Sequence, residues 1–292
     1  MRKHADDFDP QVLSLFDKYV HGLITRRDFL EGASKVTVGI TGLAALEALS
    51  PNFAEAQQIK PDDARLKADF IEIPSPGYGK VRAYRVAPAN PKGKLPVILV
   101  VHENRGLNPH IEDIARRIAL DNFIAVAPDA LFPVGGYPGD EDKARELFQS
   151  LDQEKTRRDF VATAHYLKKL PEGNGKLGAV GFCYGGGVVN YLATQVPELN
   201  AAVAFYGSAP KLEDVSRIKA PLLLHFAGND ERVNASWPPY ESALKQAHAK
   251  YEAFVYPNTQ HGFNNDTTPR YDEKAAKLAW DRTMKFFDEK LK

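Results

Sequence analysis

The only cysteine of the chain lies at the end of an apolar run, within the segment Gly181-Phe182-Cys183-Tyr184-Gly185. The Gly-x-Cys-x-Gly spacing is typical of a nucleophile elbow, a sharp strand-to-helix turn that exposes the central side chain above a sheet. With no second cysteine, the thiol has no intramolecular disulfide partner and is available as a nucleophile. Glycine-rich turns also bind phosphates, and lone cysteines are often small buried residues, so the motif alone leaves these explanations open.

An acid and a histidine follow the cysteine in the order that such a site requires. Asp230 comes after an apolar strand ending near Phe226, and His261 follows a strand ending near Tyr256. Ligand sites of open α/β sheets form at the carboxyl ends of the strands, where both residues are expected. The sequence therefore predicts a triad in which His261 takes the thiol proton and Asp230 orients the imidazole.

The elements that position these residues alternate along the chain. Near-continuous apolar strands, which suit a parallel sheet covered on both faces, are expected at 97–101, 123–127, 177–182, 201–206, 221–226 and 251–256, after an opening hairpin at 68–73 and 80–87. Helices are expected at 110–121, 154–169, 185–196, 236–249 and 271–290. The pattern predicts an eight-stranded, mostly parallel, doubly wound sheet with helices on both faces. Residues 128–150 are expected to be an irregular loop that overhangs the site.

Four segments resemble the dienelactone hydrolase family of the α/β-hydrolase superfamily, over roughly residues 65–290. They are Val101–Gly106, Gly181–Gly186, Gly228–Asp230 and His261–Phe263. The resemblance implies an α/β-hydrolase fold and a carboxylic ester hydrolase of the carboxymethylenebutenolidase type. Such an enzyme would cleave a small ester or lactone through an acyl-thioester on the cysteine, without a cofactor.

The resemblance also implies roles for the residues around the nucleophile. The backbone N–H groups of Tyr184 and Asn104 would form the oxyanion hole, the first of them at a helix start where the dipole favours negative charge. Glu103 matches a family glutamate that holds the cysteine proton in the resting enzyme. The alternative for Glu103 is an ordinary loop carboxylate that pairs with Arg105.

The substrate is less well defined than the catalytic machinery. Family lactonases carry a carboxylate-binding arginine four residues after the histidine, where this chain has Asn265. Either Arg105 supplies a replacement cation or the substrate has no carboxylate. Phe132, Tyr137 and Tyr184 are candidates to line the substrate pocket, and ordinary aromatic packing under a loop is the alternative.

The amino terminus has the features of a twin-arginine export signal. Thr25–Leu30 contains the arginine pair followed by Phe-Leu, a weakly apolar stretch runs from Val36 to Leu46, and Ala54–Ala56 fits a small-x-small cleavage site. We therefore expect a leader at 1–56, a hydrolase domain at 57–292, the twin-arginine machinery as a partner, and a periplasmic or secreted enzyme. The alternative is a helical extension that packs on the domain of a cytoplasmic protein with an uncleaved leader, because apolar residues recur at helical spacing through residues 12–20.

The composition of the chain limits the classes of function that the protein could have. The 38 basic and 38 acidic side chains balance, so no net charge favours nucleic acid. The apolar stretch of the leader is shorter than the about 20 residues that span a bilayer. We expect no metal site, because the sequence shows no metal-ligand spacing, and His225 is expected in the core. Two other classes stay open: a non-catalytic binding protein on a hydrolase scaffold, and a thiol redox protein that uses an external thiol.

Overall fold

A single eight-stranded sheet forms the body of the protein. The computed structural model describes residues 3–37 and 41–292. The strands are β1 Leu66–Ser75, β2 Gly79–Pro88, β3 Leu95–Val101, β4 Ile124–Pro128, β5 Gly173–Phe182, β6 Ala201–Phe205, β7 Leu222–Ala227 and β8 Tyr251–Tyr256. Their spatial order is β1-β2-β4-β3-β5-β6-β7-β8. The expected opening hairpin and the six apolar strands are confirmed.

The direction of the strands places the ends of β5, β7 and β8 along one edge. Strands β1 and β2 pair antiparallel, as do β2 and β4, whereas β4, β3, β5, β6, β7 and β8 run parallel to their neighbours. Parallel strands need crossover connections, which the helices supply. The loops after β5, β7 and β8, which carry the three predicted triad residues, therefore lie at the same edge of the sheet.

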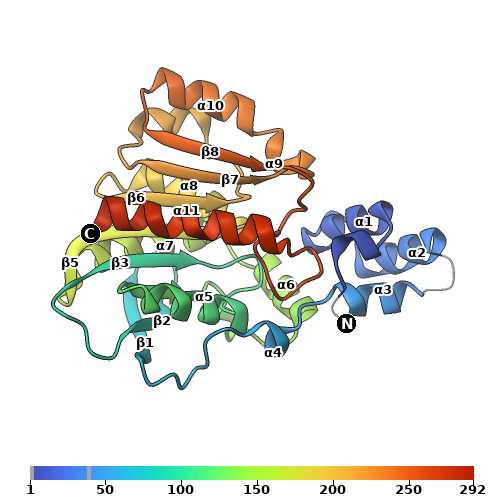
Figure 1. The fold of residues 1–292 in the computed structure, drawn as a ribbon, viewed down its shortest axis with the longest axis horizontal. Helices are drawn as coiled ribbons and strands as arrows, with labels where there is room; N and C mark the ends of the chain where they lie inside the picture. The colour runs from blue at the N-terminus through green and yellow to red at the C-terminus, as the bar shows by residue number, and fades with distance from the viewer. Residues whose placement is uncertain (1–2, 38–40) are drawn as a thin grey trace.

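Helices cover both faces of the sheet (Figure 1). Helices α7 Gln153–Lys168, α8 Tyr184–Gln195 and α10 Trp237–Gln246 bury one face, and α5 Pro109–Leu120 and α11 Glu273–Leu291 bury the other. The central strands are almost entirely buried: β4 and β6 throughout, and β3 after its first residue. This apolar burial on two faces explains why the strands lack the alternating pattern of a half-exposed sheet. The five expected helices are confirmed.

The segment 128–150 differs from the irregular loop that the sequence suggested. It contains a short 3₁₀ turn at Phe132–Val134 and the helix α6 Glu141–Gln149. Asp140 caps α6 by accepting a hydrogen bond from the backbone N–H of Lys143. Proline and glycine dominate residues 133–139, and this composition masked the short helix that follows.

The amino-terminal segment is folded into helices. Helices α1 Pro10–Val20, α2 Arg26–Val36 and α3 Gly42–Leu49 share a small apolar core of their own, and the short α4 Phe53–Ala56 leads toward β1. We call α1, α2 and α3, together with residues 21–25 between α1 and α2, the cap. Figure 1 shows the cap beyond the ends of the strands, on the side to which β7 and β8 point. The cap therefore lies over the edge where the predicted site residues gather.

Charged side chains of the body bind the cap. Arg145 of α6 lies 4.4 Å from the ring centre of Tyr19, and the hydroxyl of Tyr19 donates to Asp142. On the other side, the guanidinium of Arg270 lies 5.1 Å from the ring centre of Phe16. These cation–aromatic contacts are partly desolvated, which strengthens them relative to exposed pairs.

The arginine pair of the export motif lies at the start of α2. Thr25 caps this helix through a reciprocal pair of hydrogen bonds with Asp28, a capping box. Arg26 pairs with Asp142 at 3.2 Å, and the side chain of Arg27 is 86% exposed. Within 3–37 and 41–292, no helix has the length and apolar character needed to cross a membrane.

Candidate active site

The predicted nucleophile elbow is present at the end of β5. Cys183 joins β5 to α8 with φ 55° and ψ −115°, in the positive-φ region that side chains rarely adopt. A Cβ at Gly181 would come within 2.1 Å of the carbonyl oxygen of Gly185, and a Cβ at Gly185 would come within 2.2 Å of that of Val101. The two glycines are therefore required for the close approach of strand and helix that holds the cysteine in this conformation.

An acid–imidazole pair reaches the cysteine from the body. Nδ1 of His261 donates a hydrogen bond to Asp230 Oδ2 over 2.5 Å, which fixes the ring and leaves Nε2 as the free nitrogen. Nε2 is buried and has no hydrogen-bond partner among the described residues. His261 also packs on Tyr206, with ring centres 5.0 Å apart. The structure thus brings the predicted Asp230 and His261 together next to Cys183.

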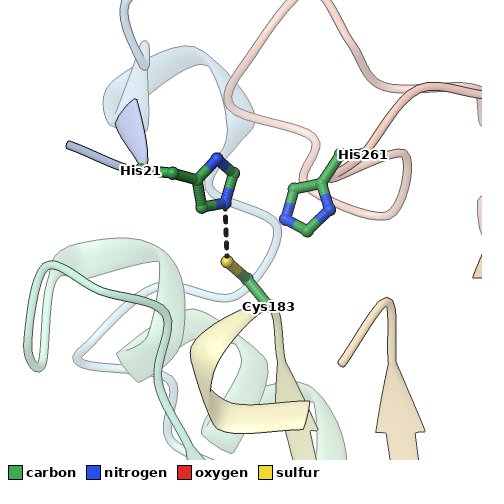
Figure 2. A group of neighbouring side chains, drawn as sticks. All are labelled: His21, Cys183 and His261. Atoms are coloured by element: carbon green, nitrogen blue, oxygen red, sulfur yellow. Dashed lines mark hydrogen bonds between the residues drawn. The ribbon is translucent and has the colours of Figure 1, made fainter. Parts of the chain in front are cut away.

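A second imidazole reaches the cysteine from the cap. Nε2 of His21, the residue after α1, lies 3.4 Å from Sγ of Cys183, and the two imidazole rings face the sulfur from different sides (Figure 2). Nδ1 of His21 donates to the backbone oxygen of Asp17 over 2.7 Å and lies 3.3 Å from its carboxylate. The ring centres of His21 and His261 are 4.8 Å apart. Sequence analysis did not identify this second histidine.

The electrostatics of the site favour a thiolate. Burial alone would raise the pKa of the Cys183 thiol, but the positive charges of His261 and His21 and the contacts of both imidazoles with the sulfur lower it to about 5. Burial opposes the charged form of His261, yet the Cys183 charge and the bond to Asp230 raise its pKa to about 10. The pKa of His21 is also raised: burial lowers it, and the Cys183 charge and the bond to Asp17 outweigh that effect. A thiolate is the reactive form of cysteine, so this arrangement suits nucleophilic attack.

The loop after β3 lies between the cap and the nucleophile. The Glu103 carboxylate accepts a hydrogen bond from Asn265 Nδ2 over 3.0 Å. The side chains of Asn104 and Arg105 both donate to the backbone oxygen of Val20, over 2.8 and 3.3 Å. Arg105 is buried, and burial lowers its pKa. The role of Glu103 in the resting enzyme and of the Asn104 backbone in an oxyanion hole remain predictions.

A cavity of about 860 Å³ opens beside the nucleophile. Tyr184 lines it, as do Cys183 and both histidines, while Arg105 lines a smaller neighbouring cavity. Phe132 lies 5.7 Å from Lys80 Nζ, and Tyr137 donates to Glu141 and packs on Phe53. Neither Phe132 nor Tyr137 is among the residues that line these two cavities, so their predicted contact with substrate gains no support from the geometry.

The same three side chains are also the described residues that could share a metal ion. The candidate ligand atoms of His21, Cys183 and His261 lie within 4.8 Å of one another. A closed zinc site has four ligands, so these three side chains alone do not define one. The three residues come from distant parts of the chain, which explains why the sequence showed no metal-ligand spacing. His225, expected in the core, is fully buried between Tyr256 and Thr283.

An eight-stranded, mostly parallel sheet with an elbow cysteine and an acid–imidazole pair at its carboxyl edge defines an α/β-hydrolase. A model of the dienelactone hydrolase family matches residues 81–291. The chain belongs to the dienelactone hydrolase family, whose members include carboxylic ester hydrolases. A second family model, described as YqhI-like, matches residues 1–37, which contain α1 and α2 of the cap.

Similar proteins support this assignment. A protein of Escherichia coli K12, provisionally named carboxymethylenebutenolidase, is 34% identical over 78% of this chain and 89% of its own length. A hydrolase fragment of the same strain, YghX, is 54% identical over 39% of this chain and 97% of its own length. A Klebsiella pneumoniae structure, provisionally described as a dienelactone hydrolase, has a TM-score of 0.69 and 30% identity, covering 77% of this chain and 99% of its own.

The site residues that the sequence did not reveal all lie in the cap or contact it. They are His21, its partner Asp17, and Arg232, whose Nη2 lies 2.9 Å from Nε2 of His21. His21 and Cys183 are 162 positions apart, and nothing in the spacing of residues links them. The available signal was the amphipathic pattern of residues 12–20, which predicted a helix that packs on the domain but not the place where it packs.

Proposed function

We propose that the protein is a thiol hydrolase that cleaves an ester or lactone through an acyl-thioester on Cys183. The observation that carries the proposal is the arrangement around the elbow: a strained cysteine between β5 and α8, with the imidazole of His261 beside it and Nδ1 of that ring held by Asp230. Each feature serves acyl transfer, and together they reproduce the roles of a nucleophile, a base and an orienting acid.

The proposed reaction has two halves. The Cys183 thiolate attacks the carbonyl carbon, and the imidazolium of His261 gives its proton to the departing alkoxide. Neutral His261 then takes a proton from water, which attacks the thioester and releases the acid. The N–H groups of Tyr184 and Asn104 would stabilise the oxyanion, and the start of α8 adds the favourable end of its dipole. Asp230 stabilises the imidazolium through its hydrogen bond.

The charges around the large cavity favour a substrate with an anionic group. The cavity is lined by more cations than acids: Arg145, Arg157, Lys211, Arg217 and Arg232 against Glu154 and Asp214. Asn265 is hydrogen-bonded to Glu103, and Arg105 donates to Val20, so both are already engaged. We propose that this cavity, rather than position 265, binds a substrate carboxylate.

Intact-mass spectrometry tests the proposed mechanism. The protein is mixed briefly with p-nitrophenyl acetate, with His261→Ala alongside. The proposal expects an acetyl adduct on Cys183 that turns over in the wild type and persists in the variant. An alkylatable thiol that forms no adduct with any ester or lactone of a panel would favour a binding protein on a hydrolase scaffold, and a mixed disulfide with an added thiol would favour redox chemistry.

We also propose that the twin-arginine machinery exports this protein in its folded state to the periplasm or beyond. The motif Thr25–Leu30 supports this, and Arg27 stays exposed in the docked cap. Cell fractionation of the wild type and of a double variant, Arg26→Lys with Arg27→Lys, tests the proposal. Retention of the variant alone in the cytoplasm is expected, and equal distribution of both would overturn it. Amino-terminal sequencing of the exported protein would show whether cleavage occurs near residue 56.

A further inference from the structure

The thiol of the proposed nucleophile is hydrogen-bonded to the cap. Sγ of Cys183 lies 3.4 Å from Nε2 of His21, whereas Nε2 of His261 is buried with no described hydrogen-bond partner. Glu103, which the family resemblance assigns to the resting proton, accepts from Asn265 instead. In the state that the structure shows, the hydrogen-bond partner of the thiol is therefore a cap residue.

His21 is held in the same way as the histidine of a triad. Its Nδ1 donates to the backbone oxygen of Asp17 over 2.7 Å, with the Asp17 carboxylate 3.3 Å away. Asp230 fixes His261 on the same ring nitrogen, but through its carboxylate oxygen. A bond on Nδ1 sets the tautomer and leaves Nε2 with a lone pair for a proton.

The surroundings of His21 are consistent with this tautomer. Arg232 Nη2 lies 2.9 Å from Nε2. Because a guanidinium only donates, its N–H and the thiol proton compete for the single lone pair of Nε2, so the Arg232 contact is released when Nε2 takes the proton. Arg232 Nε also lies 3.8 Å from the Asp17 carboxylate, so Asp17 can balance its charge when Nε2 becomes protonated. Several charged or titratable groups face His21 or the Asp17 carboxylate that pairs with it. Besides Asp17 and Cys183, they are Glu103 and Arg105 on the loop after β3, Arg232 on α9 Glu231–Asn234, and His261 and Arg270 on the loop after β8.

We propose that His21 is a second catalytic imidazole, supplied by the cap, that takes the proton of the Cys183 thiol in the resting enzyme. The S–H bond breaks, its electron pair stays on sulfur, and the proton forms an N–H bond at Nε2 of His21. The imidazolium then faces the thiolate while Asp17 stabilises its charge. His261, whose pKa is raised to about 10, carries a proton of its own, which it gives to the departing alkoxide. The inference rests on the proposed function in taking Cys183 as the nucleophile, and it applies to the chain that retains residues 1–56.

The pH dependence of alkylation tests this role, and it requires no substrate. The rate of reaction of Cys183 with iodoacetamide follows the thiolate fraction. For His21→Gln we expect the midpoint to rise by about one pH unit, so that below the wild-type midpoint the rate falls about tenfold. His4→Gln, the same change elsewhere in the amino-terminal segment, should leave the profile unchanged. Glu103→Gln compares the two candidate resting partners: a shift in this variant without one in His21→Gln would overturn the inference.

A reciprocal measurement covers the case in which His21→Gln releases the cap. NMR titration of His21, assigned by its missing signal in His21→Gln, is carried out on wild type and on Cys183→Ala. Coupling between two titrating groups is mutual, so we expect the His21 midpoint to fall in Cys183→Ala. An unchanged His21 midpoint would overturn the inference. Neither readout requires ester turnover, so loss of the proposed hydrolase activity would be seen separately, in the acyl-adduct experiment.

Discussion

Two regions of the molecule present an acid and an imidazole to one sulfur atom. The body does so with Asp230 and His261, whose contact is 2.5 Å long and buried inside the hydrolase fold. The cap does so with Asp17 and His21, whose carboxylate contact is 3.3 Å long and partly exposed. The body pair belongs to a rigid sheet edge, whereas the cap pair depends on docking of a separate small helical unit. The difference indicates separate roles for the two pairs. The body pair is held in place for the chemical steps, whereas the cap pair is present at the sulfur only while the cap is docked.

The largest effect on ester turnover is expected from removal of the Cys183 sulfur, which both regions contact. Cys183→Ala should lower ester turnover by about 10⁶-fold, the scale found when a triad loses its nucleophile. Cys183→Ser should retain weak activity, because a hydroxyl can still attack although its pKa is far from neutrality. Steady-state kinetics with p-nitrophenyl acetate measures both. Turnover by Cys183→Ala at the wild-type rate, with circular dichroism showing a folded protein, would place the reaction elsewhere.

The body pair should affect turnover more than the cap pair. His261→Ala removes the base that activates water, and we expect kcat to fall between about 10²- and 10⁴-fold at every pH. Asp230→Asn should act in the same direction, because an asparagine no longer stabilises the imidazolium. Single-turnover measurements would show which half-reaction stalls. A loss in His261→Ala no greater than in His21→Gln would remove the distinction between the two regions.

The contribution of the cap to turnover should depend on pH. The folded-state pKa of the thiol lies below its ordinary value, so the thiolate is present above about pH 5 and is lost as pH falls through that value. Without His21, the acidic limb of the pH–rate profile should shift to higher pH. His21→Gln should therefore lose about tenfold in kcat/KM at mildly acidic pH and almost nothing above the new midpoint. A loss that is equal at all pH values would indicate a structural effect of the cap instead.

The smallest expected effect concerns docking of the cap itself. Arg270 packs on the ring of Phe16 and lies 3.8 Å from Asp17. Arg270→Met should weaken docking by about 1 kcal/mol, because it removes a cation–aromatic contact and a charge pair. Hydrogen exchange of residues 10–20 should then be about fivefold faster. Lys285→Met, on the exposed side of α11, provides the matched control, and equal exchange in the two variants would contradict this account of docking.

The body could be predicted from the sequence because its signals are local. Apolar runs of strand length, helical spacing between them, and the glycines around Cys183 each specify a short segment, and the order of Cys183, Asp230 and His261 follows from the topology. The helix α6 was missed because glycine and proline precede it. The cap site could not be predicted, because the approach of His21 to Cys183 depends on how one folded unit packs on another. The Thr25–Leu30 segment shows the same ambiguity, since its threonine and aspartate also form the capping box of α2.

The most direct test of the central claim is the ultraviolet absorbance of the thiolate, measured as the difference between wild type and Cys183→Ala across pH. The signal can only come from the single cysteine of the chain. Two imidazoles at the sulfur predict that the thiolate persists down to about pH 5. A thiolate that appears only near the ordinary cysteine pKa of about 8.5 would contradict the account, because neither imidazole would then hold the proton of Cys183.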